Sequence, residues 1–364
     1  MGESIERSRP WERRPVRWLM WIAVASVVAA FLVINRGEWR AIGEAARQAR
    51  PEFLVLAALL QVGWMFLFGA SFWAGLIAAG VRLPFRGAMV ASWACNFLNM
   101  VVKSGGMSGL AVFIRAAGRR GYRASRVTLG YLLTLALGYA AFLVVLGIAL
   151  VLLSRQGGLR RLELAASSSL ALLIFAALAG LFLAVRSQHG VRRSYNLLAA
   201  VVNWISRPLL RRSLLDPDGG IRAAEESAAV RQLIRSRPAG LVPSALASLG
   251  KDLAGAAVLY AVLSAFYEPA TPALAFAAYA MTIVFSYISI VPSGLGIVEI
   301  SLTGLLIRAG VPPAAAALST VVYRLFQFWA PFLIGAAATR FTGGATTALT
   351  PDPSPVGTGE GSLQ

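Results

Sequence analysis

Long runs of apolar residues constrain this chain more than any other feature of its sequence. Five of them, at 19–34, 53–79, 129–153, 162–185 and 314–338, contain almost no charged residue. A helix rises 1.5 Å per residue, so such runs approach or exceed the length needed to cross a hydrocarbon core of about 30 Å. Helices of soluble domains need a polar face, which these runs lack. The sequence therefore predicts an all-α polytopic membrane protein.

The remaining composition excludes several classes of site. Charged residues make up 14% of the chain, against about 25% in soluble domains. Cys95 is the only cysteine and His189 the only histidine, which excludes an intrachain disulfide and a multi-histidine metal site. Neither a nucleotide-binding nor a hydrolase motif is present. We expect no catalytic residue, no metal and no cofactor, and the protein is not expected to be an enzyme.

The arginines predict the orientation. The net charge of +18 is read as a topology determinant, so no nucleic-acid partner is expected. With a cytoplasmic N-terminus, predicted cytoplasmic segments carry about three times as many Lys and Arg residues as predicted external ones. We expect a basic cytoplasmic N-terminus at 1–17, one transmembrane domain at 18–340 with a cytoplasmic loop at 186–239, and a disordered tail at 341–364. Both termini are expected in the cytoplasm of a bacterium or archaeon.

Two apolar segments are interrupted by small residues. The segment 88–114 is broken near Lys103-Ser104-Gly105-Gly106, and the segment 272–307 is broken at Pro292-Ser293-Gly294. The predicted excess of Lys and Arg on the cytoplasmic side is obtained if each segment folds back as a re-entrant hairpin. The two hairpins then enter the membrane from opposite faces. Together with about six full spanning helices, such a pair is typical of inverted-repeat transporters, whose site lies where broken helices meet.

Glu299 and Arg324 are charges in otherwise apolar segments. A charged side chain at the bilayer centre costs about 2.5–3.5 kcal/mol on insertion scales. Glu299 would lie in the first turn of a half-helix, where the helix dipole favours an anion. Arg324 needs a buried anion, and Glu299 is the candidate partner. A substrate or proton role for Glu299 and a capping role both stay open.

Other residues are candidates with less support. Glycines around Lys103 could form a backbone nest for a phosphate, or could serve close helix packing. Lys251 and Asp252 are adjacent and are not expected to share a helix face, so an interfacial position is predicted for one of them. The predicted substrate-binding or coupling residues are Glu299, Arg324, Lys103, Arg115, Gly105, Gly106, Ser108, Gly109, Pro292, Gly294 and Gly296.

These motifs resemble the flippase-like transmembrane domain of lysylphosphatidylglycerol synthases. The resemblance covers about residues 15–340 and rests on two stretches: Gly105-Gly106-Met107-Ser108-Gly109 with Arg115 and Arg119-Arg120-Gly121, and 292–299 with Glu299 at its end. The family typically reads Pro-Gly-Gly-Leu-Gly, two residues, then Glu; here Ser293 replaces the first glycine. The first stretch departs further, because many members have Pro at the position of Ser104. The resemblance implies a phospholipid-translocating module that stands alone, without the aminoacyl-transfer domain.

We therefore expect a lipid translocator that moves a phospholipid or another lipid-linked headgroup across the cytoplasmic membrane through a cleft between the two hairpins. Membrane lipids, either anionic or aminoacylated phospholipids, are the expected partners. The alternatives are an integral membrane enzyme of lipid or cell-envelope modification and a partner of a separately encoded lipid-modifying enzyme. A homo-oligomer is also compatible with the sequence.

Overall fold

The structure is a computed structural model, which describes residues 47–102, 106–155, 161–186, 238–289 and 292–342, with isolated positions at 44 and between 190 and 236. All its described elements are helices. The predicted N-terminal segment, the run 19–34, most of the loop 186–239 and the tail from 343 lie outside the described residues. The prediction of an all-α membrane protein is confirmed.

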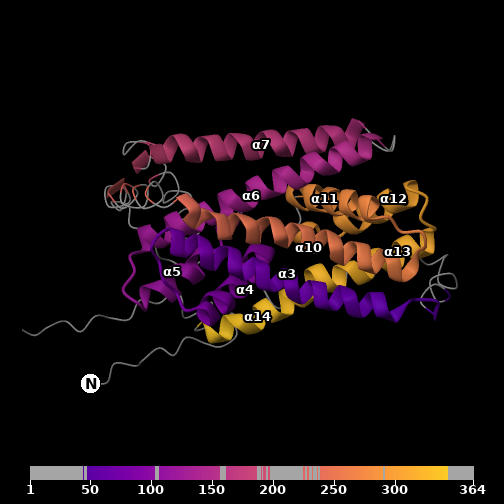
Figure 1. Cartoon of the computed structure of the whole chain (residues 1–364), viewed down its shortest axis with the longest axis horizontal. Helices are drawn as coiled ribbons and strands as arrows, with labels where there is room; N and C mark the ends of the chain where they lie inside the picture. The colour runs from indigo at the N-terminus through magenta and orange to yellow at the C-terminus, as the bar shows by residue number, and fades with distance from the viewer. Residues whose placement is uncertain are drawn as a thin grey trace, which may run out of the picture.

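Four helical stretches are long and apolar enough to cross a membrane: Pro51–Ala78, Ala124–Ser154, Pro238–Phe266 and Pro313–Phe341. They correspond to α3 (Pro51–Ala78), α6 (Ala124–Arg155), η2 with α10 (Pro238–Leu241 and Val242–Phe266), and the continuous α13, η4 and α14 (Pro313–Arg324, Leu325–Trp329 and Ala330–Phe341). The predicted run at 162–185 is α7 (Arg161–Arg186), which covers one side of the bundle (Figure 1).

Helices α3 and α10 run antiparallel along each other through the centre of the bundle (Figure 1). The backbone N–H of Arg50, just before α3, donates to the carbonyl of Ala265 near the end of α10 at 3.0 Å. Toward the other end, the hydroxyl of Ser244 donates to the carbonyl of Ser71 at 2.9 Å. Small residues at this contact allow close approach of two helix backbones, which apolar packing in a membrane favours. Helix α6 packs against both members of this pair, and α13 packs against α10.

Both interrupted segments form helix–break–helix pairs at opposite ends of the bundle (Figure 1). The first consists of α4 (Phe85–Val101) and α5 (Leu110–Gly118), and the second of α11 (Pro272–Ile288), η3 (Pro292–Gly294) and α12 (Ile297–Arg308). With nine residues, α5 is about 13 Å long at 1.5 Å per residue, too short to cross a bilayer core. At twelve residues, α12 is also too short to cross that core.

The tips of the two broken pairs meet inside the protein. The hydroxyl of Ser293, in the break after α11, donates to the carbonyl of Met100 near the end of α4 at 3.1 Å. Helix α4 is also held against α14, where a Cβ on Gly335 would lie 2.5 Å from the carbonyl of Trp93. Only a glycine permits that approach. Segments about 190 residues apart in sequence thus come together at the middle of the bundle.

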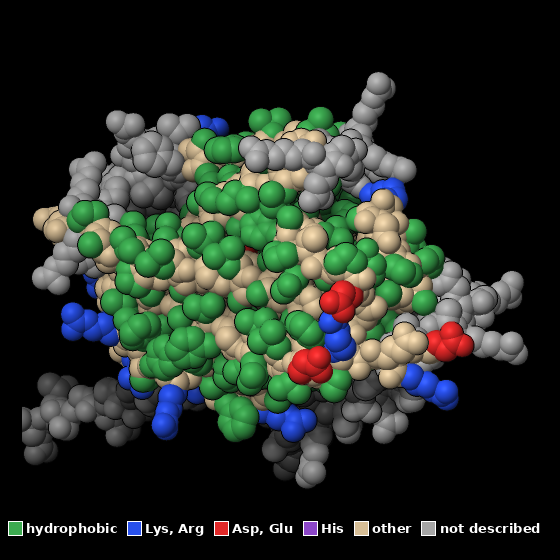
Figure 2. Space-filling model, turned by 45° about the vertical axis from the view of Figure 1, so that its right-hand side comes forward, with side chains coloured by type: hydrophobic (Ala, Val, Ile, Leu, Met, Phe, Trp, Pro, Cys, Tyr) green, Lys and Arg blue, Asp and Glu red, His purple; other side chains and the backbone are tan. Residues whose placement is uncertain are grey.

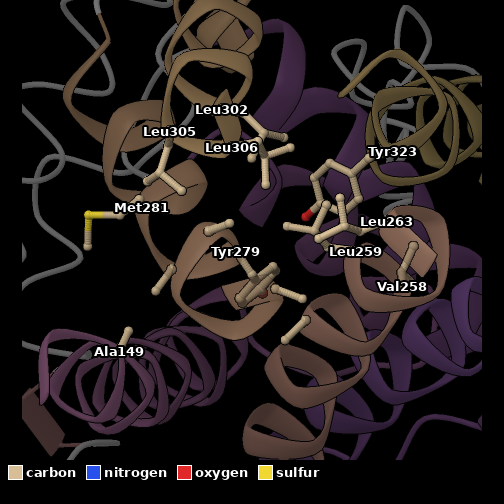
Figure 3. Close-up of a cluster of buried hydrophobic side chains, with 14 of the residues drawn as sticks. Ala149, Val258, Leu259, Leu263, Tyr279, Met281, Leu302, Leu305, Leu306 and Tyr323 are labelled. Carbon is tan, nitrogen blue, oxygen red and sulfur yellow. The ribbon is translucent and has the colours of Figure 1, made fainter. Parts of the chain in front are cut away.

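The surface and the interior have the polarity of a membrane protein. Hydrophobic side chains cover the middle of the face seen in Figure 2, whereas Lys and Arg side chains gather at its margins. Inside, the largest cluster of buried apolar side chains joins α6, α10, α11, α12 and α13. Figure 3 shows part of it, with labelled side chains that include Leu259 of α10, Tyr279 of α11 and Leu302 of α12. This cluster fixes α10 and α11, which carry much of the site described next.

Candidate functional site

A cavity of about 300 Å³ lies between the two broken helix pairs and the central helices. Six segments line it with residues at helical spacing: Trp64, Phe68, Ser71 and Phe72 on α3; Asn96, Asn99 and Met100 on α4; Thr134, Leu135, Gly138, Tyr139 and Phe142 on α6; Ser248, Lys251 and Asp252 on α10; Tyr279, Thr282, Ile283, Ser286 and Tyr287 on α11; and Tyr323, Arg324, Gln327 and Phe328 on α13 and η4. Gly106 and Ser293 contribute from the two breaks. Its volume is in the range of small-molecule sites.

The walls are mostly apolar and aromatic. Tyr139 and Phe142 of α6 contact the ring of Tyr287 on α11, with ring centroids 5.9 and 6.0 Å apart. On the α3 side, the rings of Trp64 and Phe68 stack at 5.4 Å. Such surfaces accept apolar or CH groups, so the polar specificity of the cavity depends on its few charged side chains.

The predicted ion pair between Arg324 and Glu299 is present. The Nε of Arg324 donates to Oε1 of Glu299 at 2.7 Å, and the two side chains are only 10% and 14% exposed. The guanidinium also lies 4.7 Å from the centre of the Phe328 ring, an arrangement that stabilises a cation. Arg324 lines the cavity, whereas Glu299 does not. The carboxylate therefore lies behind the arginine and orients it.

The second carboxylate oxygen of Glu299 caps the N-terminus of α12. The backbone N–H of Gly296 donates to Oε2 of Glu299 at 2.7 Å. This is the reciprocal half of a capping box, in which an acid at the third helical position caps the residue before the helix. Both carboxylate oxygens are thus engaged within the protein. Direct contact between Glu299 and a headgroup amine stays a prediction.

The break between α11 and α12 has an unusual backbone. Gly294 and Gly296 have φ angles of 66° and 84°, and Ser293, which is not glycine, has a φ angle of 53°. The left-handed region costs an ordinary residue about 1–2 kcal/mol. A weak hydrogen bond from Arg324 to the carbonyl of Ser293 at 3.4 Å joins this strained turn to the charged pair. The turn begins at Pro292, and neither Gly294 nor Gly296 lines the cavity.

The prediction that Lys251 and Asp252 do not share a helix face was wrong. Both line the cavity, and Nζ of Lys251 lies 2.5 Å from Oδ1 of Asp252. Adjacent residues diverge by about 100° around a helix, but the flexible stem of lysine lets its ammonium group bend back. Asp252 is 2% exposed near the middle of α10. The two side chains thus share one face of the site, whereas snorkelling or an interfacial position for one of them stays a prediction.

Asp252 has one satisfied and one unsatisfied oxygen. Its Oδ1 accepts from Lys251 and also from the hydroxyl of Tyr279 at 2.9 Å. Its Oδ2 is buried and has no hydrogen-bond partner among the described residues, and the same holds for Nε2 of Gln327. A Cβ on Gly255 would lie 2.5 Å from the Tyr279 ring and 3.0 Å from Nε2 of Gln327. Gly255 therefore makes the room in which Tyr279 reaches Asp252.

The first break is held by Asn99 of α4. Its Oδ1 accepts from the hydroxyl of Ser108 at 2.7 Å and from the backbone N–H of Gly109 at 2.8 Å. Gly109 also packs against Cys95, which a Cβ would meet at 2.1 Å. Gly106 has a φ angle of 86° and its carbonyl accepts from the hydroxyl of Tyr131. Of the predicted residues that the structure describes here, Gly106 lines the cavity, whereas Ser108 and Gly109 do not.

The remaining predicted residues lie apart or outside the described part of the chain. Arg115 is on α5 and does not line the cavity. Lys103 and Gly105 fall outside the described residues. Within the described ranges, no three His, Cys, Asp or Glu side chains lie close enough to hold a metal ion. Of the predicted residues and breaks, Arg324, Gly106 and the break at Ser293 lie together on the cavity. Lys251, Asp252 and Tyr279 also line it, although the sequence did not assign them to the site.

Comparisons with known proteins agree with this architecture. The family model described as "Lysylphosphatidylglycerol synthase TM region" matches residues 18–335. No curated protein matches the chain.

Proposed function

The chain belongs to the family of lysylphosphatidylglycerol synthase transmembrane regions, and from this premise we propose that it translocates phospholipid headgroups across the cytoplasmic membrane. The family implies a membrane protein of lipid modification or translocation. In our proposal, the two broken helix pairs are re-entrant hairpins. The headgroup enters the cavity between them while the acyl chains stay in the bilayer.

The observation that carries the proposal is the contact between two opposed breaks at one cavity. Ser293 reaches Met100 across the middle of the bundle, and residues of both breaks line the same space. Broken helices with a central site are typical of transporters that alternate between two openings. The cavity offers cationic donors from Arg324 and Lys251, which suit a phosphate.

The exposed arginines support the proposed orientation. At the end of the bundle that carries α5, the exposed residues include Arg82, Arg86, Arg119, Arg120 and Arg123. At the opposite end, Arg50 is paired with Glu268 at 2.9 Å. Positive charge accumulates on the cytoplasmic side of membrane proteins. The α5 end is therefore the cytoplasmic end in our proposal, and α12 ends on the external side.

The test is transbilayer movement of a phospholipid labelled on an acyl chain, in vesicles that contain the purified protein. Wild type should move the lipid at least about tenfold faster than protein-free vesicles, which corresponds to about 1.4 kcal/mol in the barrier. The double variant Glu299→Gln/Arg324→Met should lose that acceleration at normal protein abundance. Wild-type movement at the protein-free rate would refute translocation. A change in the chemical composition of the lipid would instead support the enzyme alternative.

A further inference from the structure

The charged groups around the cavity balance one another in pairs. Lys251 is paired with Asp252, and Arg324 is paired with Glu299 behind it. Among the described cavity-lining residues, no further Asp, Glu, Lys or Arg is present. The described site therefore has a formal charge of zero. A ligand with a net charge would bring an uncompensated charge into a space with low dielectric constant, which is costly.

The unsatisfied atoms show which groups a ligand would have to supply. Oδ2 of Asp252 is a buried anionic acceptor with no donor among the described residues. Asp252 is 98% buried and lines the cavity. A buried polar atom of this kind is costly unless a ligand or water satisfies it. An ammonium group satisfies it best, because a hydrogen bond between two charged groups is about twice as strong as a neutral one.

Lys251 and Arg324 carry N–H donors that have no acceptor among the described residues. An ammonium group carries three N–H donors and a guanidinium five. Among them, Lys251 donates to Asp252, and Arg324 donates to Glu299 and Ser293. The remaining N–H groups are available to a phosphate. The cavity thus offers donors for an anion beside an acceptor for a cation.

We propose that the site selects a zwitterionic headgroup, a phosphate joined to an amine with no net charge. The inference rests on the proposed function and deepens it. The phosphate contacts Lys251 and Arg324, and the ammonium group of the headgroup donates to Oδ2 of Asp252. Tyr279 acts as a positioning residue, because its hydroxyl holds the other oxygen of Asp252 at 2.9 Å. An anionic headgroup would leave Oδ2 unsatisfied and would add a negative charge.

The experiment compares two phospholipids labelled on an acyl chain in the same reconstituted vesicles, one with a phosphoethanolamine headgroup and one with a phosphoglycerol headgroup. Wild type should move the phosphoethanolamine lipid at least about tenfold faster. Asp252→Asn keeps the shape of the side chain but removes its charge and leaves Lys251 unbalanced. This variant should slow the phosphoethanolamine lipid at least tenfold and move the phosphoglycerol lipid no more slowly than wild type.

Leu253→Ala, at the next position of α10, is the control, because this side chain is exposed and does not line the cavity. It should keep the preference for the phosphoethanolamine lipid. Equal rates for the two lipids in wild type, or equal slowing of both by Asp252→Asn, would overturn the inference while translocation itself stands. Movement of neither lipid would overturn the proposed function and the inference with it. Uptake of free phosphoethanolamine without movement of the lipid would show that the ligand is a soluble phosphate ester, which also contradicts the inference.

Discussion

At the scale of single residues, the ion pair of Glu299 and Arg324 should contribute less to the free energy of unfolding than is lost when only one of its two charges is removed. Each charge is nearly buried, so removing one leaves the other without compensation. We expect Glu299→Gln and Arg324→Met each to lower the free energy of unfolding by about 3–5 kcal/mol. The double variant should recover most of that loss, because both charges are then absent.

Unfolding in detergent, measured as a double-mutant cycle, checks this expectation. The three variants must be compared at equal protein and detergent concentration. A double variant no more stable than the weaker single variant would show that the two charges do not compensate each other.

The conformation of Ser293 leads to a second prediction. Ser293→Ala and Ser293→Gly both remove the hydrogen bond to Met100. Alanine keeps the cost of a positive φ angle, whereas glycine does not. We expect the glycine variant to be more stable than the alanine variant by about 1 kcal/mol. Equal thermal stability of the two would contradict the strained backbone at this position.

The sequence indicates that Glu299 and Arg324 belong to the site, but it does not indicate the same for Asp252. Glu299 and Arg324 interrupt apolar segments, so each required a partner, and the partner proved correct. Asp252 was misplaced because neighbouring residues point in different directions around a helix. The length and flexibility of the Lys251 side chain, which a helical projection ignores, removed that objection.

At the scale of helices, the interruption of both broken segments could be predicted because glycine and proline end helices for steric reasons. The sequence also indicates some of the helix faces that line the cavity. Ser248 with Asp252 on α10, and Thr282 with Ser286 on α11, are polar residues four positions apart in apolar helices. Tyr323 and Gln327, which is in the π-helical turn at Leu325–Trp329, are also polar, four positions apart and on the cavity.

Packing of α10 against α11 gives the third prediction. Gly255→Ala would place a methyl group 2.5 Å from the Tyr279 ring, and overpacking of this kind costs about 1–3 kcal/mol. Gly250→Ala on the same helix is the control, because its Cβ would meet only the end of Leu67 at 3.4 Å. We expect a lower unfolding temperature for Gly255→Ala alone. A similar shift in both variants would mean that helix α10 is sensitive to any added methyl group.

At the scale of the whole molecule, the proposed orientation predicts which surface a membrane-impermeant thiol reagent reaches. Gly118 lies at the end of α5 and Ala309 at the end of α12, at opposite ends of the bundle, and both are exposed. Cys95 is buried and should contribute little background. In intact cells, Ala309→Cys should react, and Gly118→Cys should react only after the membrane is opened. Labelling of Gly118→Cys in intact cells would contradict the cytoplasmic assignment of the first hairpin.

The central claim is that a lipid headgroup occupies the cavity between the two broken helix pairs, and photo-cross-linking tests it most directly. A phospholipid with a photoreactive headgroup should form adducts within α10 and α11, near Asp252 and Thr282, in protein reconstituted into vesicles. Ser286→Trp, which fills part of the cavity, should abolish those adducts. Adducts confined to the outer surface of α7, or unchanged by Ser286→Trp, would contradict the account.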